Sequence, residues 1–475
     1  MKQNRKLSAC ITVCYFGLYI IIALSFLIRQ PFGSPPDEYN RYLIPQYIYE
    51  NSTLPNGYDE AIRIPGYGFS YAFQPILPYM FQGWTMKLVG LFTDSTEALV
   101  YAARSVDFIL GLIMAFMVLL LSKKWFHKER WQWLFAFLIT FLPQSIFVHT
   151  YVNTDSCCML SVVLMLYGLT CGLQNGFKLR ASVIMSIGII LCALSYYNAY
   201  GYILSCILLF ICFFLRRTEK KVFFVWKDFL KKGCFIAVLV LFGICWWFIR
   251  SAALYDGDFL GLTARDHCAS LYADAAYHPE TRVTWASQGY SVWNMVCDSD
   301  FMLLSQLSFI GIFGAMSIPT SIWIYRFYRL LFFVGVVLCT AIPMRMVKTL
   351  NGVGYGLGDV FRKRKGLERF FHGNMVFCIL MPLVLSIRYS YVTDFQPQGR
   401  YLLPALVPLA YYCVRGIEKI MGMLGVVLSK KGFVEEKRRI VEAITVGGIC
   451  TVIVICLVVS VYGYVFVYYG ANSGG

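Results

Sequence analysis

Apolar stretches of about 20 residues recur along the whole chain and set the limits on its fold. Of its 475 residues, 58% are hydrophobic and 14% are charged, whereas a soluble protein carries roughly 25% charged residues. A membrane-spanning helix needs ~20 apolar residues and satisfies its own backbone hydrogen bonds. We therefore expect an all-α, polytopic integral membrane protein forming one membrane-embedded unit over residues 1–475. About eleven spans are predicted, at 8–28, 101–121, 132–150, 156–174, 182–198, 200–215, 233–250, 322–343, 373–390, 401–420 and 443–468.

Basic residues between the apolar stretches indicate the orientation. The first stretch follows a basic N-terminus and is too long for a typical signal peptide, so we interpret it as a retained span. Lysine and arginine near span ends stay in the cytoplasm. Basic clusters at 123–130, 216–221 and 362–365, the last within a loop at 344–372, then lie on the N-terminal side. This predicts a cell-membrane protein with a cytoplasmic N-terminus and an extracytoplasmic C-terminus. The net charge of +16 fits this topology without nucleic-acid binding.

Two long outer segments, 29–100 and 251–321, are expected to carry structure of their own, since most connections run ~4–6 residues. The first includes an aromatic amphipathic stretch at 75–84, which predicts a helix lying in the membrane interface; the alternative makes 72–92 another span. In the second, Cys268 and Cys297 could form a disulfide. That segment is interpreted either as a sugar-binding surface or as a solvated acidic loop, and its candidate residues are Asp256, Asp258, Arg265, Asp266, Asp274, His278, Glu280, Arg282, Trp285, Tyr290 and Trp293.

Two adjacent carboxylates, Asp37 and Glu38, follow Pro35 and Pro36 shortly after the first span. The prolines restrict the backbone that leads into them. A carboxylate at the membrane boundary can act as a general base on a sugar hydroxyl, and partial burial would raise its pKa toward the working range. It can also ligate a divalent metal such as Mg or Mn. The alternative is that Asp37 or Ser34 caps the following helix.

The segment 34–38, with a Gln-Gly-Arg-Tyr-x-x-Pro motif at 398–404 and a Phe-Ile-Gly-Ile-Phe-Gly stretch at 309–314, resembles the GT-C class of membrane glycosyltransferases. More closely, it is similar to a group of bacterial membrane proteins that share the first two motifs. The resemblance implies a GT-C-like fold and transfer of a sugar from a polyprenyl-phosphate donor to an extracytoplasmic glycan or lipid acceptor. It also implies that Asp37, with Glu38 beside it, is the catalytic base or helps to bind a metal.

Arginine and tyrosine residues of these motifs are the predicted substrate contacts. Arg41 stands where the related proteins often have histidine; arginine cannot be deprotonated, so phosphate binding is expected there and the metal interpretation is weakened. Arg400 presents a planar fork that matches phosphate, and Gln398 and Tyr401 flank it. Gly399 permits a close backbone approach. The alternative for Arg400 is an arginine that snorkels at a span end.

Two polar pairs nearer the middle of the chain have structural alternatives. Asn153 and Asp155, in a short outer loop, are expected to contact substrate or, for Asp155, a metal; the alternative is that both cap the next helix. Arg104 and Asp107 lie three residues apart in a predicted span, where they would neutralise each other.

The predicted function is a membrane glycosyltransferase, inverting in mechanism, that serves polysaccharide biosynthesis in the cell envelope. A polymerase or ligase of surface glycans would share this chemistry. The alternative is a flippase or exporter of lipid-linked sugars or surface polysaccharide. A transporter places ionisable residues near the bilayer midplane, whereas the candidates here gather at the outer boundary, which favours the enzyme. No cofactor other than the divalent metal is predicted.

Overall fold

The computed structural model describes residues 2–217, 221–341, 366–430 and 435–469. The predicted cytoplasmic loop at 344–372 lies largely outside the described residues. The α-helices are α1 (Lys2–Arg29), α2 (Glu38–Asn51), α3 (Leu77–Gly90), α4 (Thr96–Trp125), α5 (Glu129–Thr140), α6 (Pro143–Phe147), α7 (Asp155–Asn175), α8 (Leu179–Ala193), α9 (Tyr200–Phe214), α10 (Trp226–Leu254), α11 (Leu262–Tyr272), α12 (Val292–Asp298), α13 (Phe301–Gly311), α14 (Ile322–Ala341), α17 (Leu367–Val392), α18 (Leu406–Lys430) and α19 (Glu435–Val461).

Short elements complete the chain. Two small antiparallel hairpins pair β1 (Leu215–Arg217) with β2 (Val222–Phe224) and β3 (Ile312–Phe313) with β4 (Ile318–Pro319). The remaining helical segments are the 3₁₀ helices η1 (Glu60–Ile62), η2 (Tyr71–Phe73), η3 (Tyr197–Ala199) and η4 (Gly399–Ala405) and the π-helical η5 (Tyr462–Tyr468). The predicted all-α class is confirmed.

Eight helices in the described residues are long and apolar enough to cross a membrane. They coincide with eight of the eleven predicted spans and lie at Leu7–Arg29, Thr96–Trp125, Asp155–Asn175, Tyr197–Phe214, Trp226–Leu254, Ile322–Thr340, Leu367–Val392 and Arg439–Tyr468. The other three stretches are interrupted, short or charged. The stretch 132–150 divides into α5 and α6, with Pro143 opening α6; α8 has 15 residues; and α18 carries Arg415, Glu418 and Lys419.

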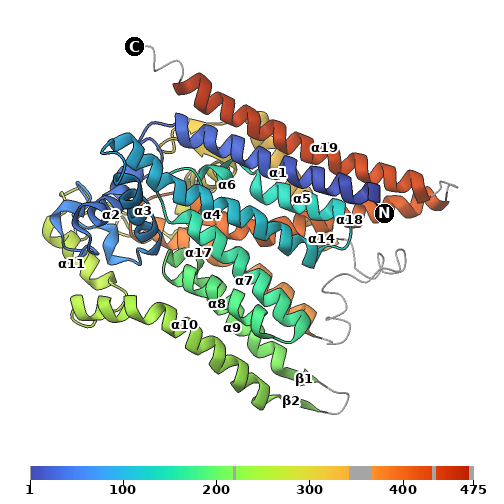
Figure 1. The fold of residues 1–475 in the computed structure, drawn as a ribbon, viewed down its shortest axis with the longest axis horizontal. Coiled ribbons are helices and arrows are strands. Elements are labelled where there is room, and N and C mark those ends of the chain that lie inside the picture. Colours follow the sequence, from blue (N-terminus) through green and yellow to red (C-terminus); the bar gives the residue numbers. More distant parts are fainter. Residues whose placement is uncertain (1, 218–220, 342–365, 431–434, 470–475) are drawn as a thin grey trace.

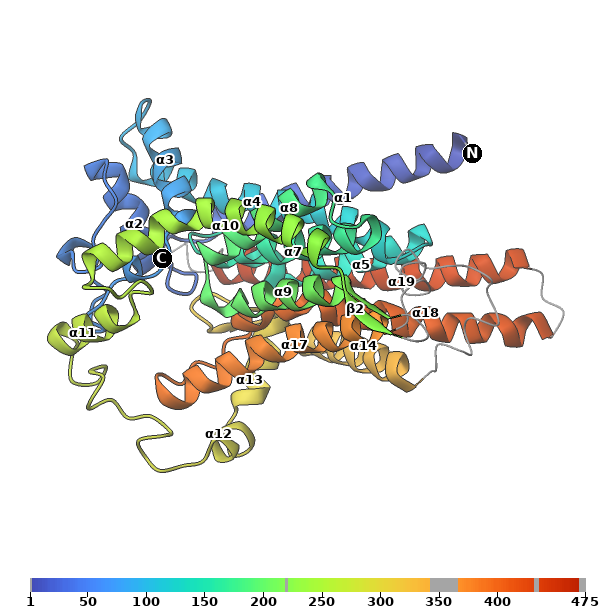
Figure 2. The ribbon, with the colours of Figure 1, turned by 90° about the horizontal axis from the view of Figure 1, so that it is seen from below.

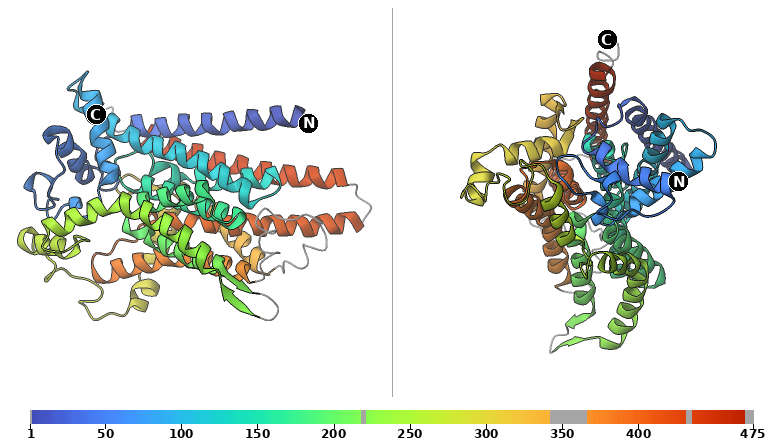
Figure 3. Two further views of the ribbon diagram at one scale, coloured as in Figure 1. Left: turned by 60° about the horizontal axis from the view of Figure 1, so that its bottom comes forward. Right: turned by 90° about the vertical axis from the view of Figure 1, so that its left-hand side faces the viewer.

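The long helices run side by side along the long axis of the molecule (Figures 1 and 2). α2, α3 and α11 gather at one end, while the β1–β2 hairpin and the start of α1 lie at the other; η5 ends on the side of α2 (Figure 3). The segments 29–100 and 251–321 therefore meet at the same end of the bundle, which is the arrangement that the predicted topology requires.

α7 is the central helix, and its membrane-spanning window is entirely buried. It lies against α8 at glycine contacts. A Cβ at Gly168 would lie 2.5 Å from the backbone nitrogen of Met185, and one at Gly188 would lie 2.7 Å from that of Met165. Such close contact lets the two backbones pack without intervening side chains. The start of α7 is thereby held at a fixed place beneath α2 and α3.

The two long outer segments are joined backbone to backbone. Gly68 has φ +72°, and a Cβ there would lie 2.3 Å from the nitrogen of Ala273. The amide of Asp274 donates to the carbonyl of Gly66 at 2.9 Å. The aromatic ring of Tyr67 stacks on that of Tyr277, with 4.3 Å between centroids. The outer end is thus one packed unit rather than two separate loops.

Two expectations for these segments are settled by the structure. The alternative span at 72–92 is wrong, because α3 has only 14 residues. The disulfide between Cys268 and Cys297 is not formed: both thiols are free, and Cys268 is buried while Cys297 is exposed. The Cys268 thiol instead donates to the carbonyl of Gly68 at 3.3 Å.

Candidate functional site

Asp37 occupies the residue before α2, with φ 61° and ψ 7°. This left-handed conformation is uncommon for a non-glycine residue and costs about 1–3 kcal/mol. The side chain makes no capping hydrogen bond, so the helix-cap interpretation does not account for it. Its carboxylate instead forms an ion pair with the guanidinium of Arg400. The side chain of Asp37 remains 34% exposed and lines a cavity.

Arg400 reaches Asp37 because η4 packs tightly against the end of α13. The amide of Gly399 donates to the hydroxyl of Ser308 at 2.6 Å. A Cβ at Gly399 would lie 1.9 Å from the nitrogen of Phe309. Arg400 also donates to the carbonyl of Pro36 at 3.2 Å. The predicted close approach at Gly399 is present, and Arg400 is buried rather than snorkelling.

Replacing Gly399 with alanine is expected to displace η4 and the Asp37–Arg400 pair with it. Overpacking a tight contact costs about 1–3 kcal/mol, and here the obstacle is backbone, which cannot rotate away. Thermal unfolding of the purified protein in detergent should show a lowered melting temperature. Gly373→Ala, where φ is not positive and nothing lies within 4 Å of the added Cβ, is the control for the glycine-to-alanine change itself. Equal melting temperatures for Gly399→Ala and the wild type would contradict the close-approach argument.

The pKa of Asp37 is lowered, whereas the sequence predicted that partial burial would raise it. Burial alone would raise the pKa of this carboxyl, but the positive charges of Arg400 and Arg41 outweigh burial and hold the pKa below its usual value. Asp37 is therefore ionised throughout the neutral range.

Glu38 faces the opposite way from Asp37 and is fully buried. Its two carboxylate oxygens each accept from the guanidinium of Arg104 at 2.7 Å. The amides of Gly33 and Val152 donate to the same carboxylate at 3.0 and 3.2 Å. All of these partners are protein groups, and Glu38 does not line the cavity. The geometry gives Glu38 a role in holding the loop before α2.

The expected pair between Arg104 and Asp107 is wrong. Arg104 turns to Glu38, and Asp107 accepts from the amide of Gln82 at 2.7 Å and from the hydroxyl of Ser156. Each of the two residues pairs with a residue far away in the sequence instead of with its neighbour on α4, and such long-range partners cannot be predicted from spacing along the chain.

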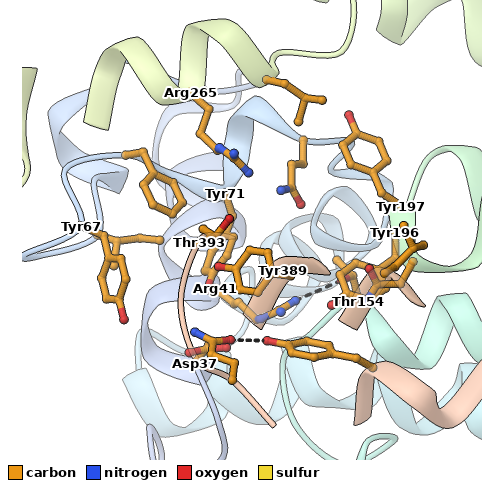
Figure 4. A pocket seen from close by; sticks show the side chains of 18 of the residues that line it. Asp37, Arg41, Tyr67, Tyr71, Thr154, Tyr196, Tyr197, Arg265, Tyr389 and Thr393 are labelled. Atoms are coloured by element: carbon orange, nitrogen blue, oxygen red, sulfur yellow. Dashed lines mark hydrogen bonds between the residues drawn. The ribbon is translucent and has the colours of Figure 1, made fainter. Parts of the chain in front are cut away.

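Arg41 extends from the first turn of α2 into the cavity (Figure 4). Its guanidinium donates to the hydroxyls of Tyr79 at 3.2 Å and Thr154 at 3.0 Å and lies over the ring of Tyr71 at 4.9 Å. The side chain is buried. Among the described residues it forms no ion pair with a carboxylate, so its positive charge is available to a bound anion.

Asn153 and Asp155 differ in how they are used. The amide of Asn153 donates to the carbonyls of Val148 and Tyr151, both at 2.7 Å, and accepts from the nitrogen of Ser156 at 3.1 Å. Asn153 therefore caps α7, as the structural alternative held. Asp155 begins α7, and its buried Oδ2 has no hydrogen-bond partner in the described part of the chain.

Aromatic and basic side chains line a cavity of about 560 Å³ at the end of the bundle where α2, α3 and α11 lie (Figure 4). Its volume suits one small substrate. Tyr401 lines it, but Gln398, Arg400, Asn153 and Asp155 do not. Sequence reasoning missed most of its tyrosines, because they come from unrelated loops and carry no spacing signal. The lining includes Asp37, Asn40, Arg41, Tyr67, Phe69, Tyr71, Gln74, Tyr79, Thr154, Tyr196, Tyr197, Asn198, Arg265, Asp266, Arg282, Arg388, Tyr389, Thr393, Gln396 and Tyr401.

The donor set does not match the predicted divalent-metal site. Asp37 is paired with Arg400, and Asp155 acts electrostatically on both Arg41 and Arg400. No group of three histidine, cysteine, aspartate or glutamate residues that could hold a metal occurs among the described residues. We derive no step through a metal.

Comparison with protein-family models identifies the family of this chain. A family model described as "Predicted membrane protein (DUF2142)" matches residues 59–409. The chain belongs to this family. No curated protein matches it. Since the matched region begins after Asp37, the finer grouping by the motifs at 34–38 and 398–404 stays a prediction.

Solved structures share the fold. ArnT from Cupriavidus metallidurans, bound to undecaprenyl phosphate, aligns with a TM-score of 0.52 at 11% identity, over 98% of this chain and 77% of its own. The archaeal oligosaccharyltransferase AglB from Archaeoglobus fulgidus, in complex with an inhibitory peptide and a dolichol-phosphate, aligns with a TM-score of 0.43 at 14% identity, over 95% of this chain. The present chain spans 56% of that protein's length. The DUF2142 chain is a membrane protein with a GT-C-like fold.

Proposed function

We propose that this protein is an inverting glycosyltransferase that moves a sugar from a polyprenyl-phosphate donor to an extracytoplasmic acceptor. One observation carries the proposal: an ionised carboxylate, Asp37, and a buried guanidinium without an ion-pair partner among the described residues, Arg41, line the same tyrosine-rich cavity. A base and a phosphate-binding group in one cavity are what this reaction needs. The undecaprenyl phosphate bound to ArnT, which shares the fold, supports a polyprenyl-phosphate donor.

The proposed reaction is a single displacement at the anomeric carbon. The oxygen of the acceptor hydroxyl attacks this carbon and forms the new glycosidic bond, while the bond from the carbon to the phosphate oxygen breaks. The polyprenyl phosphate leaves with the electron pair. Asp37 accepts the hydroxyl proton as the bond forms. Because attack and departure are on opposite faces of the sugar, the anomeric configuration inverts.

The two arginines are assigned different tasks. Arg41 lies within the cavity and stabilises the negative charge that grows on the leaving phosphate. Arg400 lies behind Asp37 and outside the cavity lining, so it positions the base instead of binding the donor as its motif suggested. Rings such as Tyr67, Tyr71 and Tyr389 offer apolar faces on which sugar rings pack.

Orientation follows from the same proposal. The cavity end, with α2, α3 and α11, faces the exterior of the cell, and the N-terminus is cytoplasmic. In this orientation the donor lipid lies in the outer half of the bilayer, and the acceptor comes from the aqueous side.

Arg41→Gln tests the donor site. Loss of a charged hydrogen-bonding group removes about 1.5–3 kcal/mol of binding, so the KM for a labelled undecaprenyl-phosphate sugar should rise at least about tenfold. Arg41→Lys keeps the charge and should recover part of this loss. Arg369→Gln, on α17 but outside the cavity, is the matched control. Donor dependence unchanged in Arg41→Gln would remove Arg41 from phosphate binding.

A further inference from the structure

The cavity carries more positive charge than a single donor phosphate requires. Four arginines line it, at 41, 265, 282 and 388, against two carboxylates, Asp37 and Asp266. Asp37 is already neutralised by Arg400 from behind. Among the described residues, Arg282 and Arg388, like Arg41, form no ion pair with a carboxylate. The cavity therefore offers positive charge to a bound substrate at more than one position.

The arginines divide between two walls. Arg41 belongs to α2, beside Asp37, whereas Arg265 projects from α11 on the opposite side of the cavity (Figure 4). Arg282 follows in the same outer segment. Both residues belong to the segment 251–321, which lies outside the cell in the orientation proposed above.

The ion pair that Arg265 does make is a weak obstacle. Arg265 donates to the neighbouring Asp266 at 2.7 and 3.0 Å, but the carboxylate side chain of Asp266 is 63% exposed. Such a solvated pair contributes little free energy. A substrate anion at Arg265 can replace it.

We propose that the acceptor is an acidic glycan or glycolipid, whose carboxylate or phosphate groups are bound by Arg265 and Arg282 while its hydroxyl is presented to Asp37. The inference rests on the proposed function and adds the substrate class. Rings near this wall, Phe69, Tyr197 and Tyr389, pack on the sugar backbone of the acceptor. Guanidinium groups match both carboxylate and phosphate geometry, so either acid satisfies the site.

The test uses the full chain in phosphatidylcholine nanodiscs and three acceptor probes: an oligogalacturonate, an oligo(glycerol phosphate) and a neutral malto-oligosaccharide of equal length. Calorimetric titration should show that at least one acidic probe binds about tenfold or more tightly than the neutral probe, with an advantage that shrinks in high salt. Comparing the two acidic probes distinguishes carboxylate from phosphate recognition. The double variant Arg265→Gln/Arg282→Gln should lose this preference, and Arg369→Gln should keep it.

Binding of undecaprenyl phosphate in the same nanodiscs separates the possible failures and shows whether the double variant is folded. If undecaprenyl phosphate binds in an Arg41-dependent way but both acidic probes bind no better than the neutral one, the acidic-acceptor inference is overturned and the proposed function stands. A double variant that retains the acid preference overturns it as well. If the wild type does not bind undecaprenyl phosphate, the proposed function fails, and this inference fails with it.

Discussion

Asp37→Asn is expected to reduce sugar transfer from a labelled polyprenyl-phosphate donor by about a hundredfold or more. General-base catalysis contributes roughly 10²–10⁴-fold, and an amide in place of the carboxylate cannot take the acceptor proton. Donor binding should change little, because Asp37 contacts the acceptor side of the reaction. Transfer rate and undecaprenyl-phosphate binding, measured on the same purified protein, check both statements.

A second variant guards against misfolding. Asp37→Asn leaves the buried guanidinium of Arg400 without its ion-pair partner, which is destabilising in itself. Asp37→Asn/Arg400→Gln removes both charges and should recover stability while remaining inactive. Transfer at the wild-type rate by a folded form of either variant would show that Asp37 is not the base.

The pH dependence follows from the direction of the pKa of Asp37. Because its pKa is below the usual value in the folded protein, the pair with Arg400 contributes stability above the unfolded pKa, and this contribution is lost as pH falls through the folded pKa. The base also remains ionised across the neutral range, so loss of transfer in mildly acidic buffer would have to come from another group.

The helical class, the membrane character and the pairing of distant motifs can be predicted from the amino-acid sequence. Apolar length signals spans directly, and the basic clusters by themselves predict that Asp37 and Arg400 lie on the same side of the membrane. Three predicted spans do not appear as single long apolar helices, for local reasons: Pro143 starts a new helix after a break, α8 has only 15 residues, and Arg415 and Glu418 pair within α18 at 2.7 Å.

The cavity itself could not be predicted. Its walls come from α2, the loop before α3, η3, α11 and α17, and their meeting depends on tertiary contacts such as Gly68 against Ala273. The adjacency of Asp37 and Glu38 in the sequence predicted that both carboxylates serve the same site. In the structure, the left-handed turn at Asp37 directs the two side chains to different partners. The sequence motif pointed to Arg400 as the main phosphate-binding residue, but Arg41 lines the cavity and Arg400 does not.

Glu38→Gln is expected to destabilise the protein more than any other single change considered. Removing one partner of a buried, hydrogen-bonded ion pair costs about 3–5 kcal/mol, since the other charge stays buried and uncompensated. Arg104 would remain locked by its bonds to the carbonyls of Leu27 and Gln30, both at 2.9 Å. The variant should show a clearly lowered melting temperature in detergent. Glu97 is an exposed carboxylate at the start of α4, the helix that carries Arg104. As a control, Glu97→Gln should melt at the same temperature as the wild type.

The same variant also distinguishes positioning from catalysis. Glu38 ties the loop before the strained Asp37 to the turn before α7, because its carboxylate accepts from the amides of both Gly33 and Val152. Weakening it should therefore lower the rate of transfer at saturating donor, while the donor KM stays near that of the wild type in whatever fraction remains folded. The double variant Asp37→Asn/Arg400→Gln is expected to show the opposite combination: it should be stable but inactive. A Glu38→Gln protein with wild-type stability and wild-type turnover would mean that the pair with Arg104 neither holds the loop nor aligns the base.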